Sequence, residues 1–217
     1  MCCALFFIPY HCYKDQSNTW YGPSKTSGLI AWAHSYPALC NFKRSKQQKE
    51  VILNTIFLHG LDSSGHGTKG RYFSKHFPTM LRPDFDGSLT QRMEQLKEII
   101  VDMGKLIVVG SSFGGLMGAC LCQDQPEKVK RLIMLAPALN FPEYQIPDRK
   151  ICTESFLVIG KRDMVTPPDI VIPAAEATFS HLETTLVDDD HLLHNYFQNL
   201  DWQTLISEGK INSGQQH

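Results

Sequence analysis

The chain has 217 residues, of which 42% are hydrophobic and 20% are charged, and its formal net charge is −1. This length and composition indicate a globular protein with one sizeable core and exclude a disordered chain. The near-neutral charge gives nucleic-acid binding no electrostatic support, and no segment approaches the ~20 consecutive apolar residues of a membrane span. We therefore expect a protein that neither binds nucleic acid nor spans a membrane.

The cysteines indicate a reducing compartment. There are seven of them, an odd number, scattered without a repeated C-x-x-C pair, so neither a disulfide framework nor a zinc site is indicated. The apolar start Ala4–Ile8 lacks a positively charged flank and a small-residue cleavage site, so we expect no secretory signal. Both observations favour a cytoplasmic protein.

Three parts of the chain differ in pattern. Residues 1–50 show no sustained period of 2 or 3.6, and we treat them as an N-terminal extension of uncertain structure. They fit a loosely docked or disordered segment, an upstream stretch read in the wrong frame, or a family-specific appendage, and the sequence does not choose among these. Residues 51–208 form the predicted domain, and residues 209–217 a polar tail.

From residue 51 onward, apolar strands alternate with helices. The predicted strands are 51–58, 79–85, 106–110, 131–139, 154–160 and 183–187, and the predicted helices are 71–76, 89–102, 114–123, one after Pro168 and one from about His191. Ser88 is the expected N-cap of the second helix. This alternation predicts an α/β fold with a mostly parallel sheet of about six strands and helices on both faces. About fifteen residues join the fourth and fifth strands, too few for a lid domain, so we expect an open, shallow site at the carboxyl ends of the strands.

The most informative motif is Gly110-Ser-Ser-Phe-Gly114, between the apolar run 106–109 and the predicted helix 114–123. A serine at the apex of a sharp strand-to-helix turn, with glycine two residues to either side, is a nucleophile elbow. The glycines keep side chains away from a strained backbone. Ser112 is therefore the candidate nucleophile, although a tight turn that merely tolerates serine, as at Ser111, would look similar.

A serine needs a base and an orienting acid. Asp163 follows the strand 154–160, and we favour it over Asp169, which lies beyond two prolines near a helix start. His191 directly follows the last strand, and we favour it as the general base over His194, one turn further on. The alternative for each is a solvated loop residue.

The oxyanion hole needs two backbone N–H donors. We expect them from Phe113, directly after the nucleophile, and from Leu61, in the loop after the first strand. His59 is expected to shape that loop rather than to act as a base, and we expect His59, Gly60 and Met164 beside the substrate. Apolar walls for an acyl group are expected from Phe113, Leu61, Met164, Phe141 and Tyr144.

Two other clusters are weaker candidates. His66, Lys69 and Arg71 would suit a phosphate or carboxylate on a substrate, but a solvated basic loop explains them equally well. The run 188–190 with His191 and His194 matches no standard metal motif. We expect no metal there.

The motifs resemble those of the α/β-hydrolase superfamily and, more narrowly, of the small bacterial YqiA/YcfP-type esterases. The matching segments are 57–64, 81–85, 109–116, 135–138 and 189–191. The order Ser, Asp, His along the chain is the one that this superfamily uses. The resemblance covers about residues 51–206 and implies hydrolysis of carboxylic esters or thioesters by Ser112, His191 and Asp163 without a cofactor.

We therefore predict a serine hydrolase that cleaves short-to-medium acyl esters or thioesters through an acyl-enzyme. Its partner is a small-molecule substrate; the oligomeric state is left open. The alternative is a non-catalytic ligand- or partner-binding protein on the same scaffold. Carbon–carbon bond hydrolysis and perhydrolysis are further reactions that the same residues permit.

Overall fold

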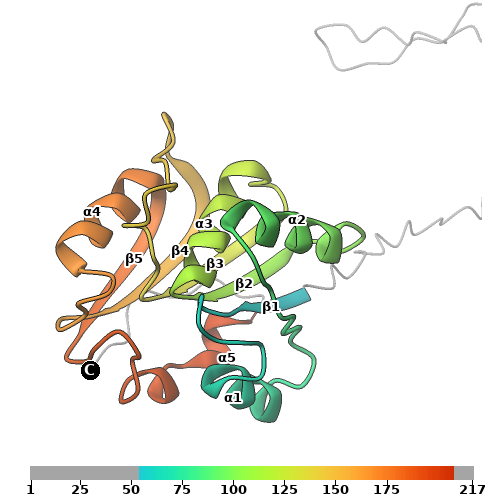
Figure 1. The fold of residues 1–217 in the computed structure, drawn as a ribbon, viewed down its shortest axis with the longest axis horizontal. Helices are drawn as coiled ribbons and strands as arrows, with labels where there is room; N and C mark the ends of the chain where they lie inside the picture. The colour runs from blue at the N-terminus through green and yellow to red at the C-terminus, as the bar shows by residue number, and fades with distance from the viewer. Residues whose placement is uncertain (1–53, 208–217) are drawn as a thin grey trace, which may run out of the picture. The chain divides into compact units, whose positions relative to one another are not determined.

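The computed structural model describes residues 54–207, and its helices and strands alternate along the chain (Figure 1). The elements are β1 (Asn54–Leu58), α1 (Thr68–His76), α2 (Leu89–Ile100), β2 (Leu106–Ser111), α3 (Phe113–Asp124), β3 (Val129–Leu135), β4 (Ile151–Gly160), α4 (Pro168–Thr178), β5 (Phe179–Val187), the 3₁₀ turn η1 (Phe197–Asn199) and α5 (Trp202–Leu205). The predicted N-terminal extension and polar tail lie outside these residues. No helix between residues 54 and 207 is long and apolar enough to cross a membrane.

The five strands form one parallel sheet in the order β1-β2-β3-β4-β5. Every crossover therefore brings the chain back to the end of the sheet where the strands begin. The carboxyl ends of all strands lie together at the opposite end. Ser111 at the end of β2 is in register with Leu135 on β3, and Gly160 at the end of β4 is in register with Val187 on β5. The segments that follow these strands are thereby brought side by side.

Helices cover both faces of the sheet, as predicted. In Figure 1, α2, α3 and α4 lie on one face, and α1 and α5 on the other. Side chains alternate accordingly along each strand. Val108 packs in the cluster with α2, α3 and α4, whereas Val109 packs with Phe73 of α1 and Trp202 of α5.

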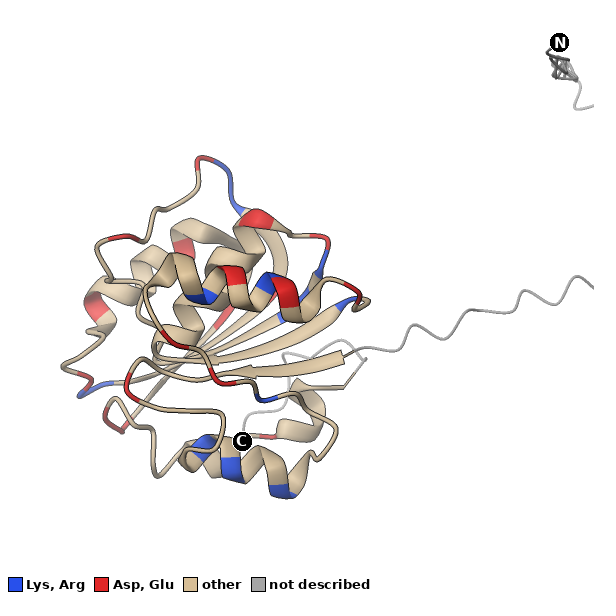
Figure 2. Ribbon diagram, turned by 45° about the vertical axis from the view of Figure 1, so that its right-hand side comes forward, with Lys and Arg blue, Asp and Glu red and all other residues tan. Residues whose placement is uncertain are grey.

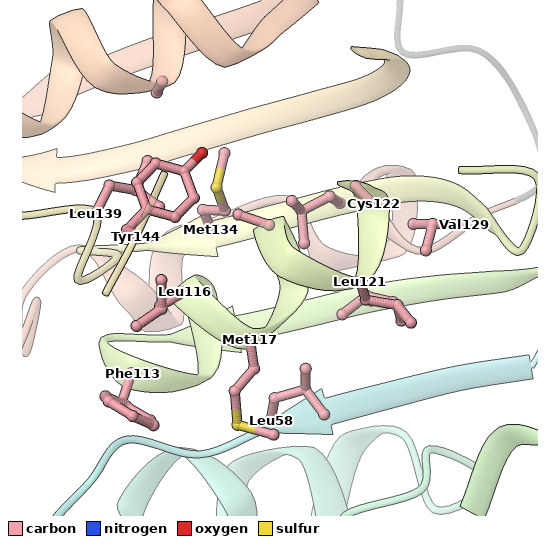
Figure 3. Close-up of a cluster of buried hydrophobic side chains, with 14 of the residues drawn as sticks. Leu58, Phe113, Leu116, Met117, Leu121, Cys122, Val129, Met134, Leu139 and Tyr144 are labelled. Carbon is pink, nitrogen blue, oxygen red and sulfur yellow. The ribbon is translucent and has the colours of Figure 1, made fainter. Parts of the chain in front are cut away.

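The central helix α3 is buried on nearly all sides, because it lies between the sheet and α2. Figure 3 shows Met117 reaching from α3 to Leu58 at the end of β1, so the helix is held against the sheet close to its N-terminus. Figure 2 shows most charged residues on the helices and loops that surround the strands. That distribution is expected for parallel strands covered on both faces.

Two predicted elements are wrong. The segment 79–85 is not a strand: it forms a single bridge, in which Leu81 pairs with Ile56. Its apolar residues suggested a strand, but Pro83 has no N–H to extend the ladder. The helix predicted from His191 is also absent, because the buried carboxylate of Asp189 accepts the N–H groups of Asn195 and Tyr196 at 2.9 and 3.1 Å and folds residues 190–196 into a loop.

The remaining predictions for the helices hold. Ser88 caps α2 through a capping box with Gln91, and α4 begins at Pro168 as expected. The connection between β3 and β4, residues 136–150, contains no helix. The described chain therefore has no lid inserted between these two strands.

Candidate active site

Ser112 occupies the turn between β2 and α3 with φ 54° and ψ −116°, a conformation that non-glycine residues rarely adopt. A Cβ at Gly110 would lie 2.7 Å from the Cα of Gly115, and one at Gly114 would lie 2.8 Å from the carbonyl oxygen of His59. Both flanking positions therefore require glycine. This accounts for the spacing of the sequence motif.

Backbone hydrogen bonds hold the strained serine from several sides. Its N–H donates to the carbonyl of Leu135 at 2.9 Å, and its carbonyl accepts from Ala138 at 3.0 Å and from Gly115 and Leu116 in the first turn of α3 at 2.9 and 3.2 Å. The end of β3 and the following loop thus fix the serine. Such redundant support is what lets a costly backbone conformation persist.

The structure brings Ser112, His191 and Asp163 into one chain of hydrogen bonds. His191 Nε2 lies 3.0 Å from Ser112 Oγ, and His191 Nδ1 lies 2.9 and 3.1 Å from the two carboxylate oxygens of Asp163. Since a carboxylate only accepts, Nδ1 carries the proton and Nε2 is free to accept from the serine hydroxyl. The rivals Asp169 and His194 lie elsewhere, on the first turn of α4 and on the wall of the cavity described below.

The Asp163 side chain is 0% exposed and that of His191 only 18%. Burial by itself raises the pKa of the Asp163 carboxyl, but hydrogen bonds from His191 and from Thr166 outweigh it and hold the pKa below its ordinary 3.8. The amides of Val165 and Thr166 donate at 2.9 and 2.8 Å. The carboxylate is thus kept ionised and aimed at the imidazole.

Thr166 was not predicted as part of this site. Its hydroxyl donates to Asp163 at 2.6 Å and lies 3.2 Å from His191 Nδ1. The sequence signal is local: an aspartate whose carboxylate accepts from amides two and three residues later is typical of Asx turns and helix caps.

The loop after β5 holds His191 in place. The Asp189 carboxylate, buried below this loop, accepts from the amides of residues 190, 195 and 196. From the other side, Lys69 on α1 donates to the carbonyl of Leu192 at 2.7 Å. Asp188 points outward to Arg162. The three adjacent carboxylates thus diverge, and residues 54–207 contain no group of His, Cys, Asp or Glu that could hold a metal ion.

His59 fixes the conformation of the loop after β1 through two hydrogen bonds. Its Nε2 accepts from the amide of Phe85 at 2.9 Å, so Nδ1 carries the proton and donates to the carbonyl of Gly60 at 2.7 Å. Burial is the main cause that lowers the pKa of His59, and the ring stays neutral. Because the Gly60–Leu61 peptide is trans, the N–H of Leu61 points away from His59.

Leu61 and Phe113 both line a cavity of about 590 Å³ that also contains Ser112 and His191. Phe113 is the first residue of α3, where amide N–H groups have no partner within the helix. Two residues whose backbone amides could serve as donors therefore border Ser112 from different elements.

The cavity has an apolar and a polar side. The more apolar side is formed by the segments after β3 and β4 together with the first residue of α3, and it includes Phe113, Ala138, Phe141, Pro142 and Val165 beside the polar Asn140 and Thr166. The more polar side is formed by α1 and the segment after β5, and it includes Thr68, Lys69, His194 and Gln198 beside the apolar Leu192 and Phe197.

Several expected substrate contacts lie elsewhere. Met164 is 87% exposed and does not line the cavity. Tyr144 is buried, with its hydroxyl 2.6 Å from that of Thr178. Neither His59, buried behind Gly60, nor His66 and Arg71 line the cavity.

Residues 48–158, just over half of the chain, match the model of the family described as serine aminopeptidase, S33. The chain belongs to this family of α/β-hydrolases. The matched segment of this S33 hydrolase includes the strand-to-helix turn with Ser112 and ends before Asp163 and His191. Comparison with curated protein sequences finds no match.

Solved structures agree with this hydrolase fold. A protein of the α/β superfamily from Xanthomonas campestris pv. campestris is 24% identical over 67% of this chain and 92% of its own, with a TM-score of 0.57. Est1E from Butyrivibrio proteoclasticus, solved with ferulic acid bound, is 13% identical over 71% and 87%, with a TM-score of 0.57. A monoacylglycerol lipase from Paleococcus ferrophilus is 14% identical over 63% and 85%, with a TM-score of 0.50.

Proposed function

We propose that this S33-family hydrolase cleaves carboxylic esters or thioesters of short-to-medium acyl chains. The observation that carries the proposal is the hydrogen-bonded chain from Asp163 through His191 to Ser112 at the cavity wall. This arrangement activates a serine hydroxyl, which is a poor nucleophile alone. The similar structures of a monoacylglycerol lipase and of Est1E with bound ferulic acid favour the same class of reaction.

In the proposed reaction, Ser112 Oγ attacks the carbonyl carbon while His191 Nε2 takes its proton. The charge that develops on the carbonyl oxygen is held by the N–H groups of Leu61 and Phe113. The protonated His191, stabilised by ionised Asp163, then gives its proton to the leaving alcohol or thiol. A water deprotonated by His191 releases the acid from Ser112.

The two sides of the cavity suggest how the substrate lies. An acyl chain suits the apolar side, where Phe113 and Phe141 pack edge to face with their ring centres 5.2 Å apart. The leaving group then lies toward Thr68 and Lys69. A volume of about 590 Å³ suits a small substrate better than a long triglyceride.

The test is hydrolysis of p-nitrophenyl esters from acetate to palmitate by wild type, Ser112→Ala and Ser111→Ala. Ser111 also lines the cavity, one residue away, so its alanine variant is a matched control for a lost hydroxyl. We expect the Ser112 variant to lose at least ~10³-fold in kcat/KM and the Ser111 variant to stay close to wild type. Full activity in Ser112→Ala would refute the proposal.

The alternative is a binding protein without catalysis. Labelling by a fluorophosphonate probe separates the two, because the probe reacts only with an activated serine. The family description also makes amides candidate substrates, and aminoacyl p-nitroanilides in the same assay would reveal an aminopeptidase. We further propose a cytoplasmic location, which is supported by free thiols at Cys120, Cys122 and Cys152.

A further inference from the structure

A buried arginine lies behind the proposed oxyanion donors. Arg92, on the first half of α2, is only 5% exposed. Arginine is rarely buried to this extent unless a carboxylate pairs with it. Within residues 54–207, however, no carboxylate lies within 4.0 Å of its guanidinium group. Asp86 and Asp62 attract the guanidinium from further away, so the groups that touch it directly must account for its position.

The direct contacts of the guanidinium group account for this position. Nη2 donates to the carbonyl of Leu61 at 3.3 Å, and Cζ lies 5.3 Å from the centre of the Phe113 ring. Nε donates to the carbonyl of Gly87 at 3.1 Å, which anchors the side chain to the start of its own helix. One rigid, planar group therefore contacts both residues whose amides are the proposed oxyanion donors, although they lie on different elements.

The contact with Leu61 fixes the backbone. The peptide that carries the Leu61 N–H is held by His59, which donates to the Gly60 carbonyl. The next peptide is held by Arg92 through the Leu61 carbonyl. With the peptide planes on both sides of Leu61 anchored, its backbone dihedrals and the direction of its N–H are determined.

A packing role alone does not account for this residue. Nη1 is buried and has no hydrogen-bond partner among the described residues, and a buried unpaired donor on a charged group is costly. An apolar side chain of the same length would pack α2 against Phe113 without that cost. An apolar side chain would supply neither the donor to Leu61 nor the cation over the Phe113 ring, and only arginine supplies both from one planar group.

We propose that Arg92 is a positioning residue of the oxyanion hole. Its guanidinium fixes the position of the Leu61 loop relative to the N-terminus of α3 at Phe113, so that both amides face the same oxygen. The inference rests on the proposed function. It assigns Arg92 no contact with the substrate. Its effect is confined to steps in which negative charge develops on that oxygen.

The test compares wild type, Arg92→Met and Arg92→Lys. Methionine keeps the apolar stem and removes both the donor and the charge. We expect Arg92→Met to lower kcat about 10- to 100-fold with KM changed less than about threefold, because loss of one oxyanion donor costs about 10²–10³ and a misdirected donor costs less. Lysine should recover part of this loss, because it keeps the charge but not the planar fork.

A second readout isolates the oxyanion. A trifluoromethyl ketone forms a hemiketal oxyanion with the serine, so its inhibition constant should weaken by the same factor as kcat/KM falls. The control is Arg82→Met. Arg82 is a half-buried arginine whose guanidinium donates to the Met80 carbonyl and not to that of Leu61, and its variant should leave both quantities within about twofold of wild type.

An Arg92→Met variant with wild-type kcat and inhibitor affinity would overturn the inference, as would a loss confined to KM. Where Arg92→Met fails to fold, Arg92→Lys decides, and an unchanged kcat in that variant would equally overturn it. Failure of the proposed function looks different, because wild type itself would then show no Ser112-dependent hydrolysis.

Discussion

Replacement of Thr166 by valine tests how the Asp163 carboxylate is controlled. Valine keeps the shape of the buried side chain and the backbone N–H that donates to Asp163, and it removes only the hydroxyl donor at 2.6 Å. A hydrogen bond to a charged group contributes about 1.5–3 kcal/mol to stability. We expect Thr166→Val to lose about 2 kcal/mol of unfolding free energy.

The loss of activity should correspond to a smaller free energy than the loss of stability, because Asp163 keeps its hydrogen bonds with His191 and with two amide donors. We expect kcat to fall about tenfold, which corresponds to about 1.4 kcal/mol. The assays are urea unfolding and ester hydrolysis. The control is Thr153→Val, at a buried threonine of β4 that faces the Cys122 thiol rather than a carboxylate.

The same variant has an expected pH dependence. The folded pKa of Asp163 lies below its ordinary 3.8, so its ionised form stabilises the fold above about pH 3.8, and this contribution is lost as the pH falls through the folded value. Valine removes one cause of the lowering, so acid should unfold the variant at a higher pH than wild type. If Thr166→Val matches wild type in kcat, unfolding free energy and acid midpoint, the argument is refuted.

Three further predictions concern the scaffold. Gly110→Ala places a Cβ against the Gly114 carbonyl, so thermal unfolding should show a loss of about 3 kcal/mol of unfolding free energy. Fluorophosphonate labelling should also be abolished, and a stable, labelled variant would contradict this. Arg131→Met removes the ion pair with Glu154 and the donor to the carbonyls of Leu205 and Ser207. Urea unfolding should therefore show a loss of about 3 kcal/mol of unfolding free energy, while kcat stays unchanged. An equally stable variant would contradict this. Burial raises the pKa of the Cys122 thiol to about 12, so iodoacetamide at about pH 8 should modify exposed Cys152 and spare Cys122 until urea is added, as mass spectrometry would detect.

The sequence predicted the sheet and the elbow because both depend on local patterns. Buried parallel strands read as apolar runs, and the glycines around Ser112 follow from clashes within a few residues of the chain. Asp163 and His191 could be chosen over their rivals because each directly follows a strand, and parallel register brings strand ends together.

Thr166 and Arg92 could not be found in this way. The role of Thr166 depends on the direction of a carboxylate, and that of Arg92 on two segments from separate elements meeting at one side chain. The wrong helix from His191 has a related cause. The buried carboxylate of Asp189 accepts amides of this segment, and a reading of strands and helices along the sequence does not consider such a bond.

The backbone of Ser112 has a consequence for how this protein changes under selection. A serine held at φ 54° and ψ −116° costs about 1–3 kcal/mol, and glycine would adopt the same angles freely. Ser112→Gly should therefore raise the melting temperature while removing the proposed nucleophile. A laboratory evolution experiment that rewarded heat resistance alone should drive this position toward glycine, whereas one that also required hydrolysis should keep serine.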